Sequence, residues 1–277
     1  MIQLTVRGGK FRTALLFSIL VAAGPAFCQE SSDGASYPSP TEQQTHTSVI
    51  AASDRQVSLS TLPKNFFADQ KEIWLFPRQL AKGKHWLPTL AIVGVTTALI
   101  ASDAHTAPYF RTTDTFSGFN RITSGVNTGA LIAAVPASIY TVGLIKKDSY
   151  AQGTALLAAE AFADGFALDL AFKGITGRKV PQQYAGNGPY SDSFFNGNHN
   201  PLHSGGFYSV HAMSAFSVAT VIAHRYRSHR WVPFVAYGMA GALSFARITG
   251  SNHFPSDVFF GGAMGFAIAR YAVLPGR

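Results

Sequence analysis

The sequence predicts an all-α protein, because six apolar segments of helical length follow one another and no alternating strand pattern competes with them. The chain is 47% hydrophobic and only 13% charged, with 26 glycines. Such a composition suits helices that pack closely in or beside a bilayer. We therefore expect a six-helix bundle. Its helices are predicted at residues 86–102, 127–145, 151–172, 208–226, 231–248 and 256–273.

The segments before the bundle have compositions of other kinds. Residues 1–28 resemble a signal peptide, with three basic residues and no acidic one, an apolar run at 14–23 and small residues near Cys28. Cys28 is the only cysteine, so cleavage there would leave no disulfide and no cysteine-based metal site. Residues 29–62 are rich in Ser, Thr, Gln, Asp and Pro and are predicted to be a disordered linker. Residues 63–277 would then form the helical domain.

The stretch at 66–80 mixes aromatic and charged residues. It is predicted as an interfacial helix broken at Pro77, or alternatively as a surface helix that caps the core.

A membrane location is favoured by the apolar helices but not by every feature. Mean hydropathy is only +0.13, and most uncharged stretches are about 16 residues long, against the ~20 that a bilayer requires. The segment at 151–172 also contains Glu160, Asp164 and Asp169. Such groups are expected to face the bundle interior or a polar cavity. The formal charge of +8 is spread without a basic stripe, which argues against a nucleic-acid partner but suits an anionic membrane or a phosphorylated substrate.

The residues between 173 and 257 contain a set that suits phosphate chemistry. Arg178 and Arg247 can each offer a fork of donors to phosphate oxygens, and Lys173 offers a compact positive charge. Ser209 is expected at a helix start after two glycines, where its hydroxyl and the free amides of the first turn can bind an anion.

Two histidines and one acid complete this set. His253 and Asp257 are four residues apart at the start of the last helix, so the acid could orient one ring nitrogen and leave the other free to attack phosphorus. His211 is expected from another helix and could protonate the leaving oxygen. Each of these residues, taken alone, could instead cap a helix or face water.

The three motifs resemble those of the type 2 phosphatidic acid phosphatase and vanadium haloperoxidase superfamily, K-x6-R-P, P-S-G-H and S-R-x5-H-x3-D. The chain reads Lys173-GITGRKV-Pro181, then Tyr208-Ser209-Val210-His211, then Ala246-Arg247-ITGSN-His253-FPS-Asp257.

The resemblance implies the helical bundle of that superfamily and a phosphohistidine mechanism. His253 would be the nucleophile, Asp257 would orient it and His211 would be the general acid. The phosphate would be held by Lys173, Ser209, Arg247 and, by its place between the motif positions, Arg178. The resemblance implies no metal and no other cofactor.

Four positions depart from the family motifs. Val180 stands where the motif has arginine, Tyr208 where it has proline, Val210 where it has glycine and Ala246 where it has serine. Loss of one fork donor could cost a few kcal/mol of transition-state binding, and a β-branched Val210 suits a permissive turn less well than glycine. A catalytically weakened phospholipid-binding protein is therefore one alternative.

Two further patterns suggest metal or paired-acid sites. His199 and His203 are four residues apart, but the surrounding Asn, Pro and Gly residues predict a loop and not a helical metal pair. Glu160 and Asp164 would share one helix face, where lining the interior or facing solvent is the favoured interpretation over a carboxylate pair.

The resemblance and the charge pattern together predict where the protein acts. Basic residues gather at the helix ends opposite the motif loops, so the positive-inside rule predicts an inner-membrane protein whose motifs face the periplasm. A cleaved signal followed by six crossings would contradict this orientation, so either the signal stays, some helices do not cross, or the domain is a soluble periplasmic bundle. The basic residues are Lys82, Lys84, Lys146, Lys147, Arg225, Arg227, Arg230, Arg270 and Arg277.

The expected activity is hydrolysis of a lipid-linked phosphomonoester or pyrophosphate, of the phosphatidic acid or polyprenyl pyrophosphate class. A soluble periplasmic acid phosphatase that acts on small phosphoesters is the alternative within the same chemistry, and a vanadate-dependent haloperoxidase is a less favoured one. No obligate protein partner is predicted.

Overall fold

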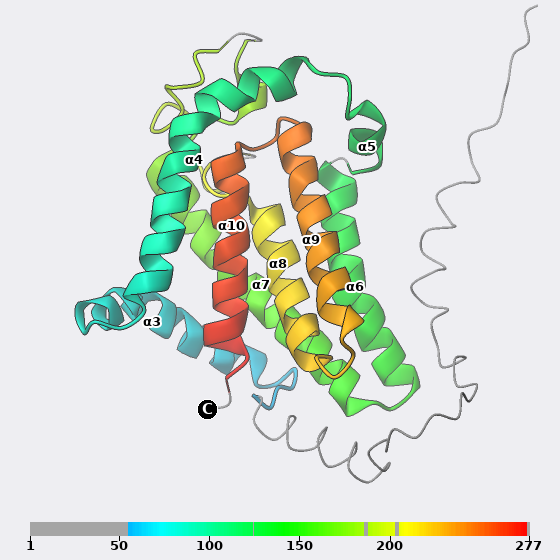
Figure 1. The fold of residues 1–277 in the computed structure, drawn as a ribbon. Helices are drawn as coiled ribbons and strands as arrows, with labels where there is room; N and C mark the ends of the chain where they lie inside the picture. Colours follow the sequence, from blue (N-terminus) through cyan, green and yellow to red (C-terminus); the bar gives the residue numbers. More distant parts are fainter. Residues whose placement is uncertain (1–54, 124, 186–187, 203–204, 276–277) are drawn as a thin grey trace, which may run out of the picture. The chain divides into compact units, whose positions relative to one another are not determined.

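The computed structural model describes residues 55–123, 125–185, 188–202 and 205–275. Eight α-helices and no strand are found in this part of the chain, which confirms the all-α prediction (Figure 1). The predicted signal at 1–28 lies outside the described residues, and so do residues 29–54 of the predicted linker at 29–62.

Each of the six expected helices is present. Five match the expected boundaries closely, but the first continues ten residues beyond its expected end and contains Pro108. An interior proline removes one backbone hydrogen bond, but a helix can continue beyond it with a kink. The helices are α4 (Trp86–Thr112), α6 (Gly125–Ile145), α7 (Ser149–Thr176), α8 (Val210–Arg225), α9 (Trp231–Thr249) and α10 (Pro255–Ala267), which a π-helical turn (Ile268–Val273) extends.

Two more helices flank the bundle. Helix α3 (Leu62–Ala81) runs unbroken through Pro77, so the predicted break there is wrong, and the helix packs against α7. The short α5 (Ser117–Ile122) was not predicted, because six residues without apolar periodicity give no helical signal.

A buried ion cluster joins α3 to the bundle. Arg55 donates from Nη2 to Asp69 at 2.7 Å and to the carbonyl of Ala272 at 2.7 Å, and it also pairs with Glu160 of α7. Asp164 accepts from Gln70 of α3 at 3.0 Å. Glu160 and Asp164 therefore face the interior, beneath α3.

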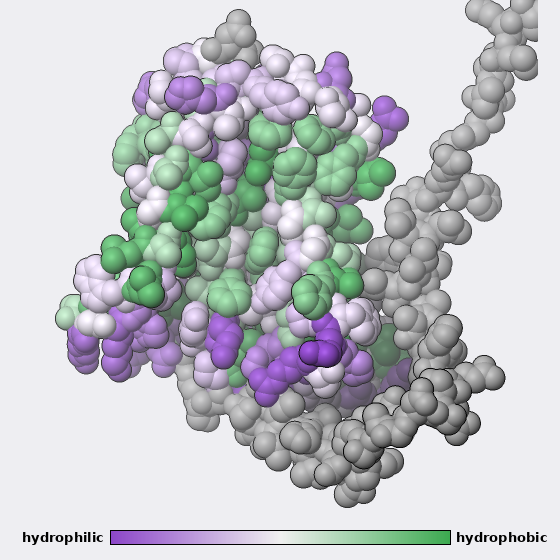
Figure 2. Space-filling view, in the orientation of Figure 1, coloured by the Kyte–Doolittle hydropathy of each residue, from purple (hydrophilic) through white to green (hydrophobic). Residues whose placement is uncertain are grey.

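The six long helices divide into an inner and an outer group. The inner helices α7, α8 and α10 bury many of their residues, whereas the outer helices α4, α6 and α9 bury few. Only the outer three are long and apolar enough, among the described helices, to cross a membrane. Figure 2 shows an apolar belt between two polar ends on the face that α4, α9 and α10 present. These features fit a protein embedded in a bilayer.

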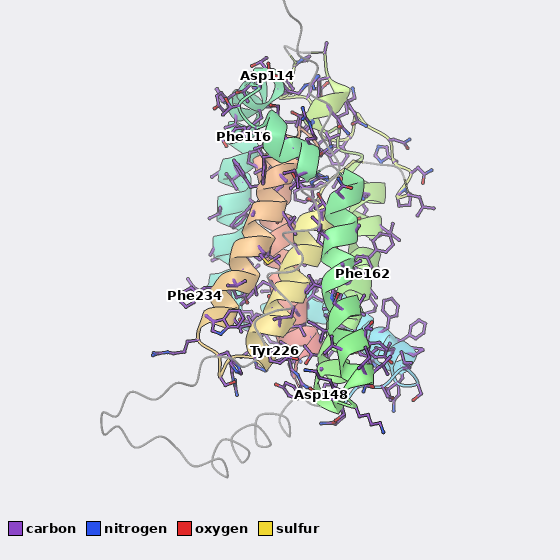
Figure 3. The ribbon with its side chains drawn as sticks, turned by 90° about the vertical axis from the view of Figure 1, so that its right-hand side faces the viewer. Asp114, Phe116, Asp148, Phe162, Tyr226 and Phe234 are labelled. Carbon is purple, nitrogen blue, oxygen red and sulfur yellow. The ribbon has the colours of Figure 1, made fainter. Side chains whose placement is uncertain are left out.

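The two ends of the bundle differ in the segments they carry. The α6–α7 and α8–α9 turns lie at one end, and the starts of α8 and α10 lie at the other (Figure 1). Figure 3 shows Asp148 and Tyr226 at the first end, and Asp114 and Phe116 at the second. The first end exposes the predicted basic residues Lys146, Lys147, Arg227 and Arg230.

Close contact between α8 and α10 depends on two glycines. A Cβ added to Gly265 would lie 2.1 Å from the carbonyl oxygen of Met213, and one added to Gly261 would lie 2.5 Å from the carbonyl oxygen of Ser209. Small residues four apart let two helix backbones approach in this way. The contact brings the first turns of α8 and α10 side by side.

We predict that Gly265→Ala destabilises the protein by about 1–3 kcal/mol, because the methyl group must displace the α8 backbone. Gly241→Ala on α9 is the matched control, since a Cβ there meets nothing within 4 Å. The control should be neutral or stabilising by up to about 1 kcal/mol through helix propensity. Unfolding in detergent, followed by circular dichroism, measures both, and equal stability of the two variants would contradict the predicted close contact.

Candidate functional site

The three motif segments meet at the end of the bundle where α8 and α10 begin. The backbone amide of Ser209 donates to the carbonyl of Asp257 at 3.1 Å, which joins the second motif to the third. The loop before α8 crosses the first motif at Gly206, where a Cβ would lie 2.9 Å from Cγ of Lys173. Gly205 and Gly206 both have φ near +100°, which glycine adopts without strain.

The loop between α9 and α10 holds His253 beside Asp257. The amides of Asn252 and His253 both donate to the carbonyl of Arg247, at 3.0 and 3.1 Å, so the loop folds back on the end of α9. Asp257 lies in the first turn of α10 and accepts from the amide of Phe254 at 2.9 Å. Nδ1 of His253 then lies 3.5 Å from Oδ2 of Asp257. The four-residue spacing thus brings the two side chains together, as the sequence suggested.

Arg178 lies at the centre of a buried polar network. Its Nη1 donates to Asp257 at 2.5 Å and to Ser256 at 2.7 Å, and its Nη2 donates to Asp103 at 2.6 Å. Its Nε donates to Ser193 at 3.1 Å. The guanidinium also lies 4.3 Å from the ring centroid of Phe194. Every nitrogen of Arg178 is therefore engaged by protein acceptors, and the structure directs this side chain to Asp257 and not to an open phosphate position.

Asp103 is a site residue that the sequence reasoning missed. It comes from the outer helix α4, is buried, and accepts from both Arg178 and the hydroxyl of Ser256. A lone acid inside an apolar helix is a signal of a functional or paired group. That signal was present in the sequence, but its partner lies 75 residues away.

The environment of Asp257 favours its ionised form. Burial acts to raise the pKa of this carboxyl, but the charges of Arg178 and His253 and the amide of Phe254 outweigh it and hold the pKa below its usual value. A carboxylate beside Nδ1 stabilises the ring tautomer that carries the proton on Nδ1 and leaves Nε2 unprotonated.

Lys173 and Arg247 are both largely buried but have different partners. Lys173 is nearly buried, and its Nζ lies 2.9 Å from Oδ2 of Asp169, one turn earlier on α7. Arg247 is buried and donates from Nη2 to the carbonyl of Thr123 after α5. Its Nε is also buried, and no acceptor lies within hydrogen-bonding reach of it among the residues that the structure describes. A buried donor without an acceptor is costly, and an incoming anion would satisfy it.

Ser209 and His211 occupy the first turn of α8. Ser209 is the N-cap, buried, with its hydroxyl 3.4 Å from the amide of Ala212. His211 is partly exposed and faces α6, since a Cβ on Gly129 would lie 3.8 Å from its Nε2. The two residues therefore point to different neighbours, one into the α8–α10 junction and one towards α6.

The four departures from the family motifs are accommodated by packing. Val180 is fully buried, and a Cβ added to Gly205 would lie 3.3 Å from each of its methyl groups. Tyr208 is buried and donates its hydroxyl to the carbonyl of Gly165 at 2.9 Å. Val210 is the first residue of α8 and is not among the residues with positive φ, so its branched side chain meets no backbone conflict. Ala246 is buried within α9.

Of the two histidines considered as a metal pair, His199 is described and is not in a helix. His199 lies in a loop with its Nδ1 2.9 Å from the carbonyl of Gly174, and His203 lies outside the described residues. Among the described residues, the one group of three or more potential metal ligands is Asp69, Glu160 and Asp164, beneath α3.

Comparison with known proteins agrees with this geometry. Residues 152–274 match the family model of the PAP2 superfamily. No curated protein and no solved structure gave a significant match. The matched segment includes all seven residues expected at the site, and the family implies phosphatase activity on phosphoesters. Over residues 152–274, this match agrees with the family resemblance that the motifs suggest.

Proposed function

We propose that this protein hydrolyses a lipid-linked phosphate ester through a phosphohistidine intermediate. The observation that carries the proposal is the buried Nε of Arg247, which has no acceptor among the described residues. The carbonyl of the same residue accepts from the amide of His253, which pairs with Asp257. Phosphate oxygens are acceptors of the kind that a guanidinium binds well. Lys173, held by Asp169, and the amides at the start of α8 would supply further donors.

In the first chemical step, Nε2 of His253 attacks phosphorus. The N–P bond forms, the bond from phosphorus to the leaving oxygen breaks, and His211 gives that oxygen a proton. Asp257 stabilises the positive charge that develops on the ring of His253. Arg247 and Lys173 stabilise the charge on the phosphoryl oxygens, so the mechanism needs no metal ion.

In the second step, water attacks the phosphohistidine. His211, now neutral, takes a proton from the water, the N–P bond breaks, and inorganic phosphate leaves. The same histidine thus acts first as an acid and then as a base, which restores the resting protonation states.

We further propose that Arg178 and Asp103 position the nucleophile and do not bind phosphate. Asp103 accepts from Arg178, Arg178 donates to the carboxylate of Asp257, and that carboxylate in turn would orient His253. This assignment replaces the phosphate-binding role that the motif position suggested for Arg178.

The apolar belt and the exposed basic end support a membrane location. We infer that the helical domain, 63–277, lies in the inner membrane through its outer helices. The exposed basic residues at the α6–α7 and α8–α9 turns would face the cytoplasm by the positive-inside rule, so the site would face the periplasm. The exposed apolar belt favours this location over a soluble periplasmic enzyme.

We predict that His253→Ala abolishes phosphate release from phosphatidic acid, because the proposed intermediate forms on Nε2 of this residue. Activity of the wild type should survive excess EDTA. His229→Ala, a change at an exposed histidine of the α8–α9 turn, is the matched control and should retain full activity. Wild-type turnover by His253→Ala would remove the assigned nucleophile.

For His211→Ala, the loss should depend on the leaving group. We expect about 10²–10⁴-fold slower release from an alkyl phosphate, whose leaving oxygen must be protonated. The loss should be much smaller with p-nitrophenyl phosphate, whose leaving group departs readily as an anion. Equal losses on both substrates would show that His211 is not the acid for the first step.

For Arg178→Ala, we predict a lower free energy of unfolding by about 3–5 kcal/mol, because Asp103 and Asp257 would stay buried without their cation. Lys179→Ala, at the adjacent and more exposed position, should change stability little. Chemical unfolding of both variants in detergent provides the measurement. A stable Arg178→Ala protein would contradict the central role of this network.

A further inference from the structure

A buried cluster of three carboxylates lies between α3 and α7, away from the candidate catalytic site. Asp69 of α3 and Glu160 and Asp164 of α7 each expose 3% or less of their surface. One carboxylate oxygen from each of the three lies within 4.8 Å of the other two. Glu160 precedes Lys173 by thirteen residues on α7, which is about 20 Å at a rise of about 1.5 Å per residue. No step of the proposed mechanism uses these acids.

Arg55 contacts two of the three carboxylates. Its Nη1 donates to Asp69 at 2.5 Å and also to Glu160, and its Nη2 donates to the second oxygen of Asp69 at 2.7 Å. The third acid, Asp164, is fully buried but makes no ion pair with any residue that the structure describes. One guanidinium carries a single positive charge, so it cannot balance three ionised carboxylates.

One oxygen of Asp164 is in position to bind a further ligand. Its Oδ1 accepts from Nε2 of Gln70 at 3.0 Å, which holds the carboxylate in one orientation. Its Oδ2 is buried, and no hydrogen-bond donor lies within reach of it in the described part of the chain. A buried polar atom without a partner is costly, and buried charges in proteins are paired or bind metal ions. A cation beside Oδ2 would remove this cost.

The donor atoms of the cluster suit a hard divalent cation. The group consists of carboxylates alone, with no histidine or cysteine, and such oxygen ligands favour Ca²⁺ or Mg²⁺ over zinc or copper. Ca²⁺ binds its oxygens at about 2.3–2.6 Å, so two oxygens on opposite sides of the ion are up to about 5 Å apart. The spacing of the three carboxylates falls within this limit, so all three can reach one ion.

We propose that Asp69, Glu160 and Asp164 bind one divalent cation, of the class of Ca²⁺, which holds α3 against α7. The ion and Arg55 together would balance the three negative charges. Because one ligand comes from α3 and two come from α7, all three can bind the ion only when α3 is docked on the bundle. Cation binding and the docking of α3 are therefore coupled, and the role of the ion is structural.

Thermal unfolding of the intact protein in detergent, with saturating Ca²⁺ or with EDTA, tests the site. We expect Ca²⁺ at about a hundredfold excess over its Kd to raise the midpoint by about 5–10 °C. Asp164→Asn keeps the shape of the side chain and removes its charge, so this variant should lose most of the shift. In EDTA it should melt at or above the temperature of the wild type, because the unbalanced buried charge is gone.

Glu72→Gln is the matched control, since Glu72 is an exposed acid of α3 that does not belong to the cluster. It should keep the shift of the wild type. A full Ca²⁺ shift in Asp164→Asn would place the ion elsewhere and overturn the inference. A wild-type midpoint that depends on pH but not on Ca²⁺ would also overturn it, because protons would then balance the charge.

Activity distinguishes this structural site from the proposed chemistry. Well below the unfolding midpoint, EDTA should leave phosphate release unchanged, because the ion lies far along α7 from the catalytic residues. Loss of phosphate release in EDTA with no change in the midpoint would contradict the structural role. If the protein releases phosphate from no substrate, the proposed function fails, and the unfolding and binding measurements still decide the cation site.

Terbium, which occupies Ca²⁺ sites and luminesces near an excited tryptophan, gives a direct binding measurement. Nε1 of Trp74 donates to Gln70 at 3.1 Å, and Gln70 in turn donates to Asp164, so this indole lies close to the site. We expect Tb³⁺ luminescence that excess Ca²⁺ removes and that falls at least fivefold in Asp164→Asn. Trp74→Phe should also lose the luminescence but keep the Ca²⁺ shift in unfolding. A wild type with neither Tb³⁺ luminescence nor a Ca²⁺ shift would overturn the inference.

Discussion

The arrangement of the site depends on one buried cation, Arg178. Its guanidinium joins the loop after α7 to the outer helix α4 through Asp103 and to the last helix through Asp257. Neither carboxylate could remain buried and ionised without it. The same contacts that satisfy these charges also fix the carboxylate beside His253, so the stability of this end of the bundle and the geometry of the proposed nucleophile have a single physical origin.

The division into inner and outer helices explains how a chain of modest hydropathy can suit a membrane. The ionisable residues lie mainly on the inner helices, where Glu160, Asp169 and Asp257 each have a cationic neighbour. The outer helices carry the exposed apolar side chains. The mean hydropathy of the whole chain averages the inner and outer helices and so hides the apolar belt. The hydropathy of each separate helix is therefore the better guide to membrane association.

Sequence patterns predicted well the features that depend on interactions between residues close together in the chain. The helix positions followed from apolar periodicity, and the approach of His253 to Asp257 followed from a four-residue spacing with Pro255 at a helix start. The partner of Asp103 and the true neighbours of Arg178 depend on tertiary contacts across 75 and 79 residues, which no local pattern contains. Pro77 misled the prediction because packing of α3 against α7 outweighs one missing backbone bond.

Under the proposed function, the charges of the site would also explain how the replacement of the motif arginine by Val180 is tolerated. Three acids, Asp103, Asp169 and Asp257, lie among three cations, and their contacts pair Lys173 and Arg178 with protein carboxylates. Under the proposed function, a phosphate would therefore be attracted less by an excess of positive charge than by donors held in fixed directions. One such donor is the Nε of Arg247, which has no acceptor among the described residues. The others are the amides in the first turn of α8, where the helix dipole favours an anion. Donors that are already oriented need little reorganisation when charge develops on the phosphoryl group, so fewer of them can suffice.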